Sequence, residues 1–417
     1  MSLLVLVGVL LALIGTAPGT GRAQTPAGFY ATRYDRTPSV RELGLLGQAL
    51  FTDRTLSASG RMACSTCHDP SHGMTPANAL AVQPGGLRLA DWGTRAVPTL
   101  KYLQSTPAFS AHATESDGND SEDQGPAGGY GWDGRFAHPH DQVVAPLLSP
   151  LEMANHSVPE VLARLRRSPH AARMQATFGP AVLQPDHALQ AWNGMRLALE
   201  VYQQDPATFA PYTSKYDAFL RGQVALAPAE RRGLALFNAP DRGNCARCHV
   251  DSIRAGGFPA FTDFGFVALG VPRNPDIPAN RDPAHVDLGL CGPERTDLAG
   301  NASACGLFKT PTLRNVALKR RYFHNGLMSR LEDVVRFYAQ RDTHPERYYP
   351  RNAQGQVQLY NDLPTRYHAN IDQQPPFGRH PGQPDALTAS EIRDVVAFLH
   401  TLTDGYVPVA HRAPGHP

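Results

Sequence analysis

The motif Cys-x-x-Cys-His occurs twice in this chain, at residues 64–68 and 245–249. It is the attachment signature of c-type haem, because two thiols at this spacing can add to the two vinyl groups of one porphyrin. The histidine after each pair, His68 or His249, is then placed beneath the iron as the proximal ligand. Zinc is the main alternative, but neither motif has a second cysteine pair with zinc spacing. The sequence therefore predicts two covalent haems, attached through Cys64, Cys67, Cys245 and Cys248.

The composition is that of an ordinary globular protein. The 417 residues are 42% hydrophobic and 18% charged, and the formal net charge is +2. A charge so close to balance gives no electrostatic reason to expect a nucleic-acid or polyanion partner. The length is comfortable for two domains. The 37 glycines and 37 prolines predict that much of the chain is ordered loop.

The amino-terminal residues have the pattern of a secretory signal peptide. Residues 3–14 are apolar or glycine, a run too short to span a bilayer, and Gly21-Arg22-Ala23 is a small-x-small cleavage site. No later apolar run approaches the length of a membrane span. We therefore expect residues 1–23 to be removed and the mature protein to be periplasmic, where c-type haem is attached.

Two cysteines remain after four are assigned to haem. Cys291 and Cys305 lie in a stretch rich in glycine, asparagine and alanine. In an oxidising compartment two such cysteines form a disulfide more often than they stay free. A disulfide is therefore predicted here, and two unrelated buried thiols are the alternative.

Helical patterning precedes each haem motif. Residues 40–51 carry apolar side chains at helical spacing before the first motif, and residues 228–237 do so before the second. The clearest helix begins at a capping box formed by Thr388 and Glu391. Few segments alternate as strands do.

This organisation predicts a mainly α fold. We expect two cytochrome c-like haem domains, joined and surrounded by long ordered loops, with little β structure. The boundary is predicted before the helical stretch 187–202, which gives an N-terminal haem domain at 24–186 and a C-terminal haem domain at 187–417.

Several sequence blocks, taken in order, resemble the bacterial dihaem cytochrome c peroxidase family. They are residues 45–70, Trp-Asp-Gly-Arg at 132–135, Pro-Leu-Glu-Met at 150–153, residues 308–316 and residues 395–399. The resemblance covers essentially all of the mature chain. It implies a peroxidase-type oxidoreductase with two haem c groups that reacts with hydrogen peroxide.

Two positions resemble the MauG branch of this family. Tyr338 lies where ordinary peroxidases have a methionine ligand of the C-terminal haem, and Arg88 falls at the position of their switching histidine. The resemblance implies a low-spin C-terminal haem held by His249 and Tyr338, and an open N-terminal haem. A phenolate ligand stabilises oxidised iron. The alternatives are a core aromatic role for Tyr338 and Met328 as the ligand.

Four further residues match MauG by their spacing. In MauG the matching positions line the peroxide site and the space between the haems. Glu152 would move a proton between the peroxide oxygens. Pro146 cannot ligate iron, and Trp132 would couple the haems. Each alone could be an ordinary carboxylate, turn proline or core tryptophan, and His138 or His140 could also approach the pocket. The four residues are Trp132, Gln142, Pro146 and Glu152.

The chain departs from the MauG pattern in three places. Ala96 replaces an asparagine ligand of the inter-haem calcium ion, and residues 319–321 (Lys-Arg-Arg) replace a stretch that supplies calcium with carbonyl ligands. Three cations beside a divalent ion are unfavourable, so calcium binding is doubtful. Gly243 stands where MauG has the surface tryptophan through which oxidation leaves for its partner.

The sequence supports three functions, led by a MauG-like oxidoreductase. Peroxide would react at the open haem, and a secreted partner protein would be oxidised over a distance. The Trp-Asp-Gly-Arg and Cys-Gly-Pro regions resemble MbnH, a MauG relative that oxidises a tryptophan of its partner. The second function is an ordinary dihaem peroxidase supplied with electrons by a small cytochrome or cupredoxin. The third is a non-enzymatic electron carrier.

Overall fold

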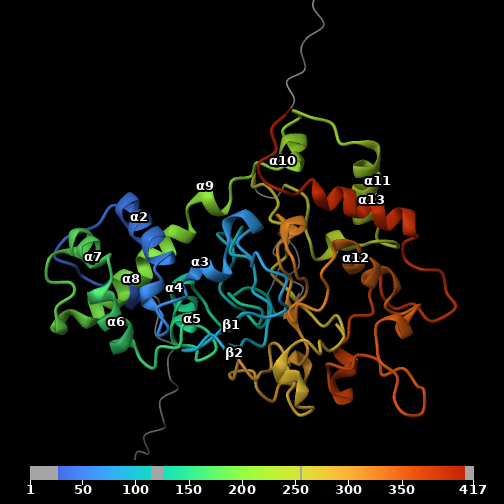
Figure 1. Cartoon of the computed structure of the whole chain (residues 1–417). Helices are drawn as coiled ribbons and strands as arrows, with labels where there is room; N and C mark the ends of the chain where they lie inside the picture. Colours follow the sequence, from blue (N-terminus) through green and yellow to red (C-terminus); the bar gives the residue numbers. More distant parts are fainter. Residues whose placement is uncertain (1–26, 114–124, 254–255, 409–417) are drawn as a thin grey trace, which may run out of the picture.

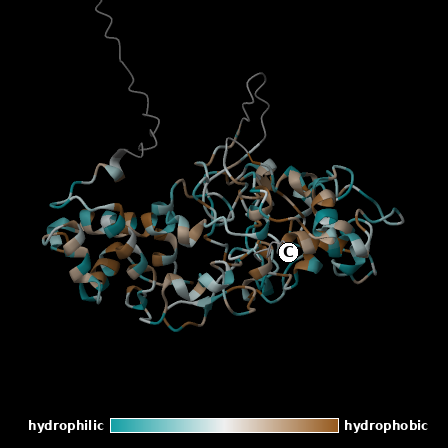
Figure 2. Cartoon of the chain, turned by 90° about the horizontal axis from the view of Figure 1, so that it is seen from above, coloured by the Kyte–Doolittle hydropathy of each residue, from teal (hydrophilic) through white to brown (hydrophobic). Residues whose placement is uncertain are grey.

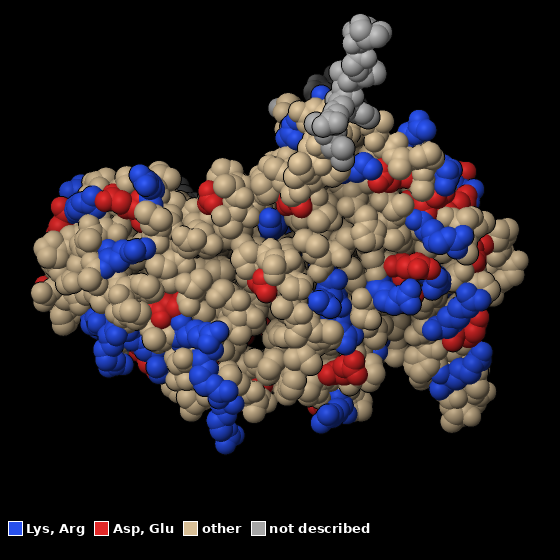
Figure 3. All heavy atoms as spheres, turned by 45° about the horizontal axis from the view of Figure 1, so that its top comes forward, with Lys and Arg blue, Asp and Glu red and all other residues tan. Residues whose placement is uncertain are grey.

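The computed structural model describes residues 27–113, 125–253 and 256–408. The predicted signal peptide, residues 1–23, lies outside this part of the chain. Helices gather at the two ends of an elongated molecule, and loop-rich chain lies between them (Figure 1). Seen from above, the helices of both ends mix hydrophobic and hydrophilic residues, as amphipathic helices do (Figure 2). On the face in Figure 3, basic and acidic side chains are interspersed.

The described α-helices vary from single turns to sixteen residues. They are α1 (Ala27–Tyr30), α2 (Val40–Phe51), α3 (Cys64–Cys67), α4 (Pro139–Gln142), α5 (Val144–Leu148), α6 (Val158–Arg167), α7 (Ala171–Phe178), α8 (Ala188–Gln203), α9 (Pro206–Phe209), α10 (Lys215–Leu220), α11 (Pro228–Asn238), α12 (Leu331–Gln340) and α13 (Ala389–His400). Short 3-10 helices occur in the connections between them.

The helices before the two haem motifs form where the sequence predicted them. Ser39 caps α2 by accepting the Glu42 N–H, and the Glu42 carboxylate accepts the Ser39 N–H at 2.9 Å. The second of these helices, α11, begins at Pro228, whose missing N–H costs nothing in a first turn. The capping box of α13, formed by Thr388 and Glu391, is confirmed.

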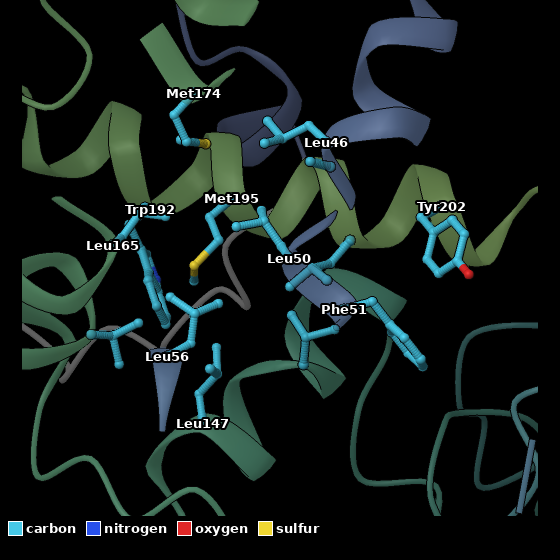
Figure 4. Packing of buried hydrophobic residues seen from close by; sticks show 14 of the residues in the cluster. Leu46, Leu50, Phe51, Leu56, Leu147, Leu165, Met174, Trp192, Met195 and Tyr202 are labelled. Carbon is cyan, nitrogen blue, oxygen red and sulfur yellow. The ribbon is translucent and has the colours of Figure 1, made fainter. Parts of the chain in front are cut away.

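The N-terminal core is built on the packing of α2 against α8 (Figure 4). Leu46 and Leu50 of α2 are buried with Met195 of α8. Gly47 allows the close approach, because a Cβ there would lie 2.0 Å from the Ala198 carbonyl oxygen. The two helices therefore touch through their backbones.

The C-terminal core has the same construction. Helix α11 packs on α13, and a Cβ on Gly233 would lie 2.0 Å from the Asp394 carbonyl oxygen. Helix α12 adds Leu331 and Val335 to the buried cluster. Each haem motif thus follows a helix that approaches its partner through a glycine.

The two hydrophobic cores divide after α8, and the predicted domain boundary stays a prediction. The boundary between residues 186 and 187 falls just before α8, yet this helix buries its apolar face in the N-terminal core. Phe209 still belongs to the first cluster, and Tyr216 is in the second. The division therefore lies between these two residues, because packing against α2 decides where α8 belongs.

Strands are few, in agreement with the predicted fold class. The described residues contain two antiparallel pairs of two-residue strands, β1 (Pro84–Gly85) with β2 (Asp91–Trp92), and β3 (Phe266–Val267) with β4 (Phe308–Lys309). The fold is mainly α with long loops, as expected.

The structure contains the Cys291–Cys305 disulfide that the sequence predicted. Both cysteines are buried in a small cluster with Leu290 and Ala304, apart from the two helical cores. In the part of the chain that the structure describes, no helix is long and apolar enough to cross a membrane.

Candidate active site

The first haem motif is presented by a single turn of helix. Helix α3 carries Cys64 and Cys67, and His68 follows with its N–H bonded to the Cys64 carbonyl at 3.0 Å. The Nδ1 atom of His68 lies 2.9 Å from the Met74 carbonyl oxygen. Because a carbonyl only accepts, Nδ1 carries the proton and Nε2 keeps its lone pair for a metal. Burial lowers the pKa of His68 to about 4, which keeps the ring neutral.

The second motif repeats this arrangement. Cys245 and Cys248 lie on or beside a short 3-10 helix, and His249 donates its N–H to the Cys245 carbonyl. The Nδ1 atom of His249 lies 3.0 Å from the Phe261 carbonyl oxygen, so Nε2 is again the free nitrogen. None of the four motif cysteines takes part in a disulfide, in contrast to Cys291 and Cys305. Both motifs therefore present two thiols and one metal-ready nitrogen, the groups that c-type haem attachment requires.

A large cavity lies beside the second motif. Its wall includes chain from both halves of the molecule, because Trp132 lines it together with residues of the C-terminal half. The lining residues that bear on the chemistry are Trp132, Cys245, Cys248, His249, Lys319 and Tyr338.

Tyr338 reaches this cavity from α12. The face of α12 that carries Leu331 and Val335 is buried in the core, and Tyr338 stacks on Phe377 with ring centres 5.4 Å apart. Burial raises the pKa of the Tyr338 phenol, and the negative charges of the two motif thiolates would raise it further. Tyr338, Cys245 and Cys248 line the same cavity. Met328, the rival ligand, packs against the second core and is not among the described residues that line the cavity.

Trp132 is held rigidly at the cavity wall. Its indole Nε1–H donates to the Ala96 carbonyl at 2.7 Å, and its own carbonyl accepts the Lys309 N–H at 2.8 Å. The neighbouring Asp133 accepts from Arg95 and Arg135, at 2.6 and 2.7 Å. Since Arg95 also binds a C-terminal residue, Asp287, this turn ties the two halves together.

Glu152 lies beside the first motif. Burial raises the pKa of Cys64 and Cys67, and the negative charge of Glu152 adds to this rise. Burial raises the pKa of Glu152 itself to about 7, with Arg135 opposing the rise and Glu294 adding to it. The Glu152 side chain is nevertheless exposed, so solvent can reach its carboxyl group.

The backbone around Glu152 is fixed by short-range bonds. Its N–H donates to Ser149 and its carbonyl accepts from Gly86, at 3.1 and 2.8 Å. Pro146 lies in α5, and its carbonyl accepts the Met153 N–H. Arg88, at the position of the switching histidine, is exposed in the turn between β1 and β2.

The two histidines near Gln142 are engaged elsewhere. The Nδ1 atom of His140 lies 2.9 Å from the Glu200 carboxylate, and Tyr30 donates to the same carboxylate at 2.8 Å. His138 stacks on His140 with ring centres 5.0 Å apart. Gln142 ends α4 and is half-buried, and its part in a peroxide site stays a prediction.

Sequence reasoning missed the partners of these residues. Glu294 influences Glu152 from the disulfide segment, and Glu200 influences His140 from α8. No sequence signal could have found these pairs, because the members are far apart in the chain and belong to no motif.

Comparisons with known proteins agree with this geometry. A family model described as "Di-haem cytochrome c peroxidase" matches residues 41–225. MauG of Paracoccus denitrificans is 33% identical over 383 residues, which cover 88% of this chain and 90% of that protein. The chain belongs to the dihaem cytochrome c peroxidase family.

A solved structure and a further relative by sequence extend the comparison. The dihaem peroxidase BthA of Burkholderia thailandensis is 35% identical, with a TM-score of 0.76 and coverage of 92% of this chain and 91% of BthA. Cytochrome c551 peroxidase of Nitrosomonas europaea is 27% identical over 302 residues, 72% of this chain and 73% of that protein. This dihaem peroxidase is therefore a peroxidase-type oxidoreductase with two covalent c-type haems.

The residues aligned with the calcium ligands do not fit a calcium ion. Ala96 has no side-chain oxygen, and its carbonyl is taken by the Trp132 indole. Lys319 lines the cavity, whereas Arg320 is exposed and Arg321 donates to the Ala79 carbonyl. Calcium prefers several oxygen ligands, and these residues bring positive charge instead.

Proposed function

We propose that this dihaem peroxidase uses hydrogen peroxide to oxidise a partner protein over a distance, as the MauG branch does. The observation that carries the proposal is Tyr338 in the wall of the cavity beside His249, whereas Met328 is not among the described residues of that wall. His249 and Tyr338 would be the two protein ligands of the second haem. A tyrosine ligand stabilises oxidised iron, so such a haem is better suited to holding an oxidising equivalent than to passing on electrons at high potential.

The first motif would be the peroxide site. His68 would hold the haem from one side, and Pro146 offers no side chain that could ligate iron. Glu152, with a pKa raised to about 7, can accept and release a proton near neutral pH, which a general acid–base catalyst must do. Trp132 would lie on the electron route between the two sites, since it lines the cavity of the second motif.

Electrons would pass from the partner protein to the haems by a route different from that in MauG. A Cβ on Gly243 would lie 2.4 Å from the Leu236 carbonyl oxygen, so a tryptophan does not fit this position. We propose that the protein acts in the periplasm after loss of residues 1–23. Its substrate would be a secreted protein oxidised at a tryptophan, the side chain oxidised by MbnH.

The test replaces Tyr338 by phenylalanine in the holoprotein. Loss of the phenol oxygen should convert the second haem from six- to five-coordinate, seen as loss of the low-spin signal in electron paramagnetic resonance. Tyr348→Phe is the matched control, because its hydroxyl group donates to the Arg336 carbonyl in α12 and Tyr348 is not among the described residues that line the cavity. An unchanged low-spin signal in Tyr338→Phe would refute the assignment.

An ordinary peroxidase is the second candidate, favoured by the cytochrome c551 peroxidase among the relatives. Such an enzyme reduces peroxide with electrons from a small redox protein. Rapid peroxide-dependent oxidation of reduced cytochrome c at steady state would support it. Slow oxidation of cytochrome c by an enzyme that still reacts with peroxide would support the first candidate.

A further inference from the structure

Lys319 places a positive charge in the wall of the second haem cavity. Its backbone is fixed at the end of a short 3-10 helix, where its N–H donates to the Val316 carbonyl and its carbonyl accepts the Tyr322 hydroxyl at 3.1 Å. Its ammonium nitrogen lies 6.0 Å from the centre of the Trp132 ring. Lys319 and Trp132 therefore line the same cavity as the second haem motif.

The carboxylates in the same wall are already paired. Each of the three binds an arginine, and the other lysine of the wall, Lys309, donates to the Gly129 carbonyl. The pairs are Asp287 with Arg95, Asp362 with Arg273, and Asp372 with Arg247. Within residues 27–113, 125–253 and 256–408, the Lys319 ammonium has no hydrogen-bond or ion-pair partner, and the Trp132 ring lies at the limit of cation–π distance.

A buried ammonium group without a counter-charge is unfavourable. Lys319 is half-buried, and the loss of hydration around its ammonium group lowers its pKa to about 8. The face of an aromatic ring at the limit of cation–π distance offsets only a small part of it. Charges removed from water in proteins are normally paired, so we expect an anion in the cavity next to Lys319.

The cofactor of this family supplies such an anion. Haem carries two propionate carboxylates, and the second motif attaches a haem beside the cavity that Lys319 lines. We propose that the Lys319 ammonium forms an ion pair with a propionate of the second haem, next to Trp132. A protein side chain then provides positive charge at the place where the aligned residues do not fit calcium.

This pair has an electrostatic consequence. A cation near the haem stabilises the reduced iron relative to the oxidised iron, because reduction adds a negative charge. Lys319 is therefore a positioning residue that holds the propionate ionised and raises the reduction potential of the second haem. Its effect is visible at equilibrium and does not depend on the reaction with peroxide.

The first experiment measures the midpoint potential of the second haem in holoprotein carrying Lys319→Met. We expect the equilibrium constant for reduction to fall by about tenfold, which for one electron is about 59 mV. The potential should also become pH-dependent, because the unpaired propionate takes up a proton. Lys319→Arg should restore the wild-type values. Arg320→Met, which neutralises the exposed neighbour, is the matched control and should leave the potential unchanged.

Two results would overturn the proposal in these variants. One is a wild-type potential and pH dependence in Lys319→Met, and the other is an equal shift in Arg320→Met. If Lys319→Met loses its haem, the proposal is tested by comparing the wild type with Lys319→Arg, because both proteins keep the positive charge.

The second experiment measures the midpoint potential of the second haem between about pH 7 and pH 9 in the wild type and in Lys319→Arg. Other titratable groups in the cavity wall contribute equally to both, namely Asp287, Lys309, Tyr322, His324, Tyr338, Asp362 and Asp372, besides the haem-binding residues and Arg247. A paired ammonium group keeps its proton over this pH range, so the two proteins should show the same dependence of the midpoint potential on pH. A step near pH 8 that is present in the wild type and absent from Lys319→Arg would show an unpaired ammonium and overturn the proposal.

Discussion

The two haem motifs are alike in their own residues and different in what surrounds them. Each histidine directs Nδ1 to a backbone carbonyl, and each motif follows a helix that packs through a glycine. Near the first motif lies Glu152, whose pKa is raised to about 7 by burial. Near the second lies Tyr338, a ligand candidate. Attachment is therefore encoded twice in the same way, whereas the chemistry of each site is set by residues outside the motif.

The largest expected effect tests the first site. Glu152→Gln should leave both haems attached and slow the reaction with peroxide by about 100- to 10,000-fold, since the amide cannot accept a proton. Stopped-flow absorbance measures this rate. In the wild type the rate should rise with pH through about 7, as the carboxyl group ionises, and this step should vanish in the variant.

Glu294→Gln is the matched control for this experiment. The charge of Glu294 raises the pKa of Glu152, so its removal should shift the pH step to lower pH and leave the maximal rate nearly unchanged. A wild-type rate in Glu152→Gln would make Glu152 a structural residue, and the first site would need another base.

The disulfide sharpens the comparison, because in the described chain it belongs to the C-terminal half alone. Replacing Cys291 and Cys305 together by serine should lower the free energy of unfolding by about 3 kcal/mol, the chain-entropy value for a loop of this size. Denaturant unfolding of the holoprotein measures it. Alkylation of the unreduced, denatured wild type should label neither cysteine, and labelling of both would rule the bridge out.

The two packing glycines test whether the domains are built alike. Gly47→Ala and Gly233→Ala should each destabilise by about 1–3 kcal/mol, because the added methyl group must push a backbone carbonyl away. Gly44→Ala on α2 is the control and should be neutral or slightly stabilising, since nothing lies within 4 Å and alanine favours the helix. Thermal unfolding would show equal shifts if the two helix pairs are equivalent.

Much of the site was predictable because haem attachment is a local property. The thiol spacing and the adjacent histidine are fixed by consecutive residues, so Cys64 to His68 and Cys245 to His249 needed no fold. The capping box of α13 and the Cys291–Cys305 pair are local in the same sense. The placement of α8 was not predictable, because an amphipathic helix pattern does not say which core receives it.

The sequence alone determined that this protein carries two haems, is mainly helical and contains one cysteine pair free to bond. It did so through short-range chemistry, in which neighbouring residues act together. The tertiary structure decided the rest. It brought Glu294 to Glu152 and set Lys319 against Trp132, where no carboxylate of the described residues pairs with the ammonium group. These are electrostatic relations between distant parts of the chain, and they exist only once packing has fixed which charges are buried together.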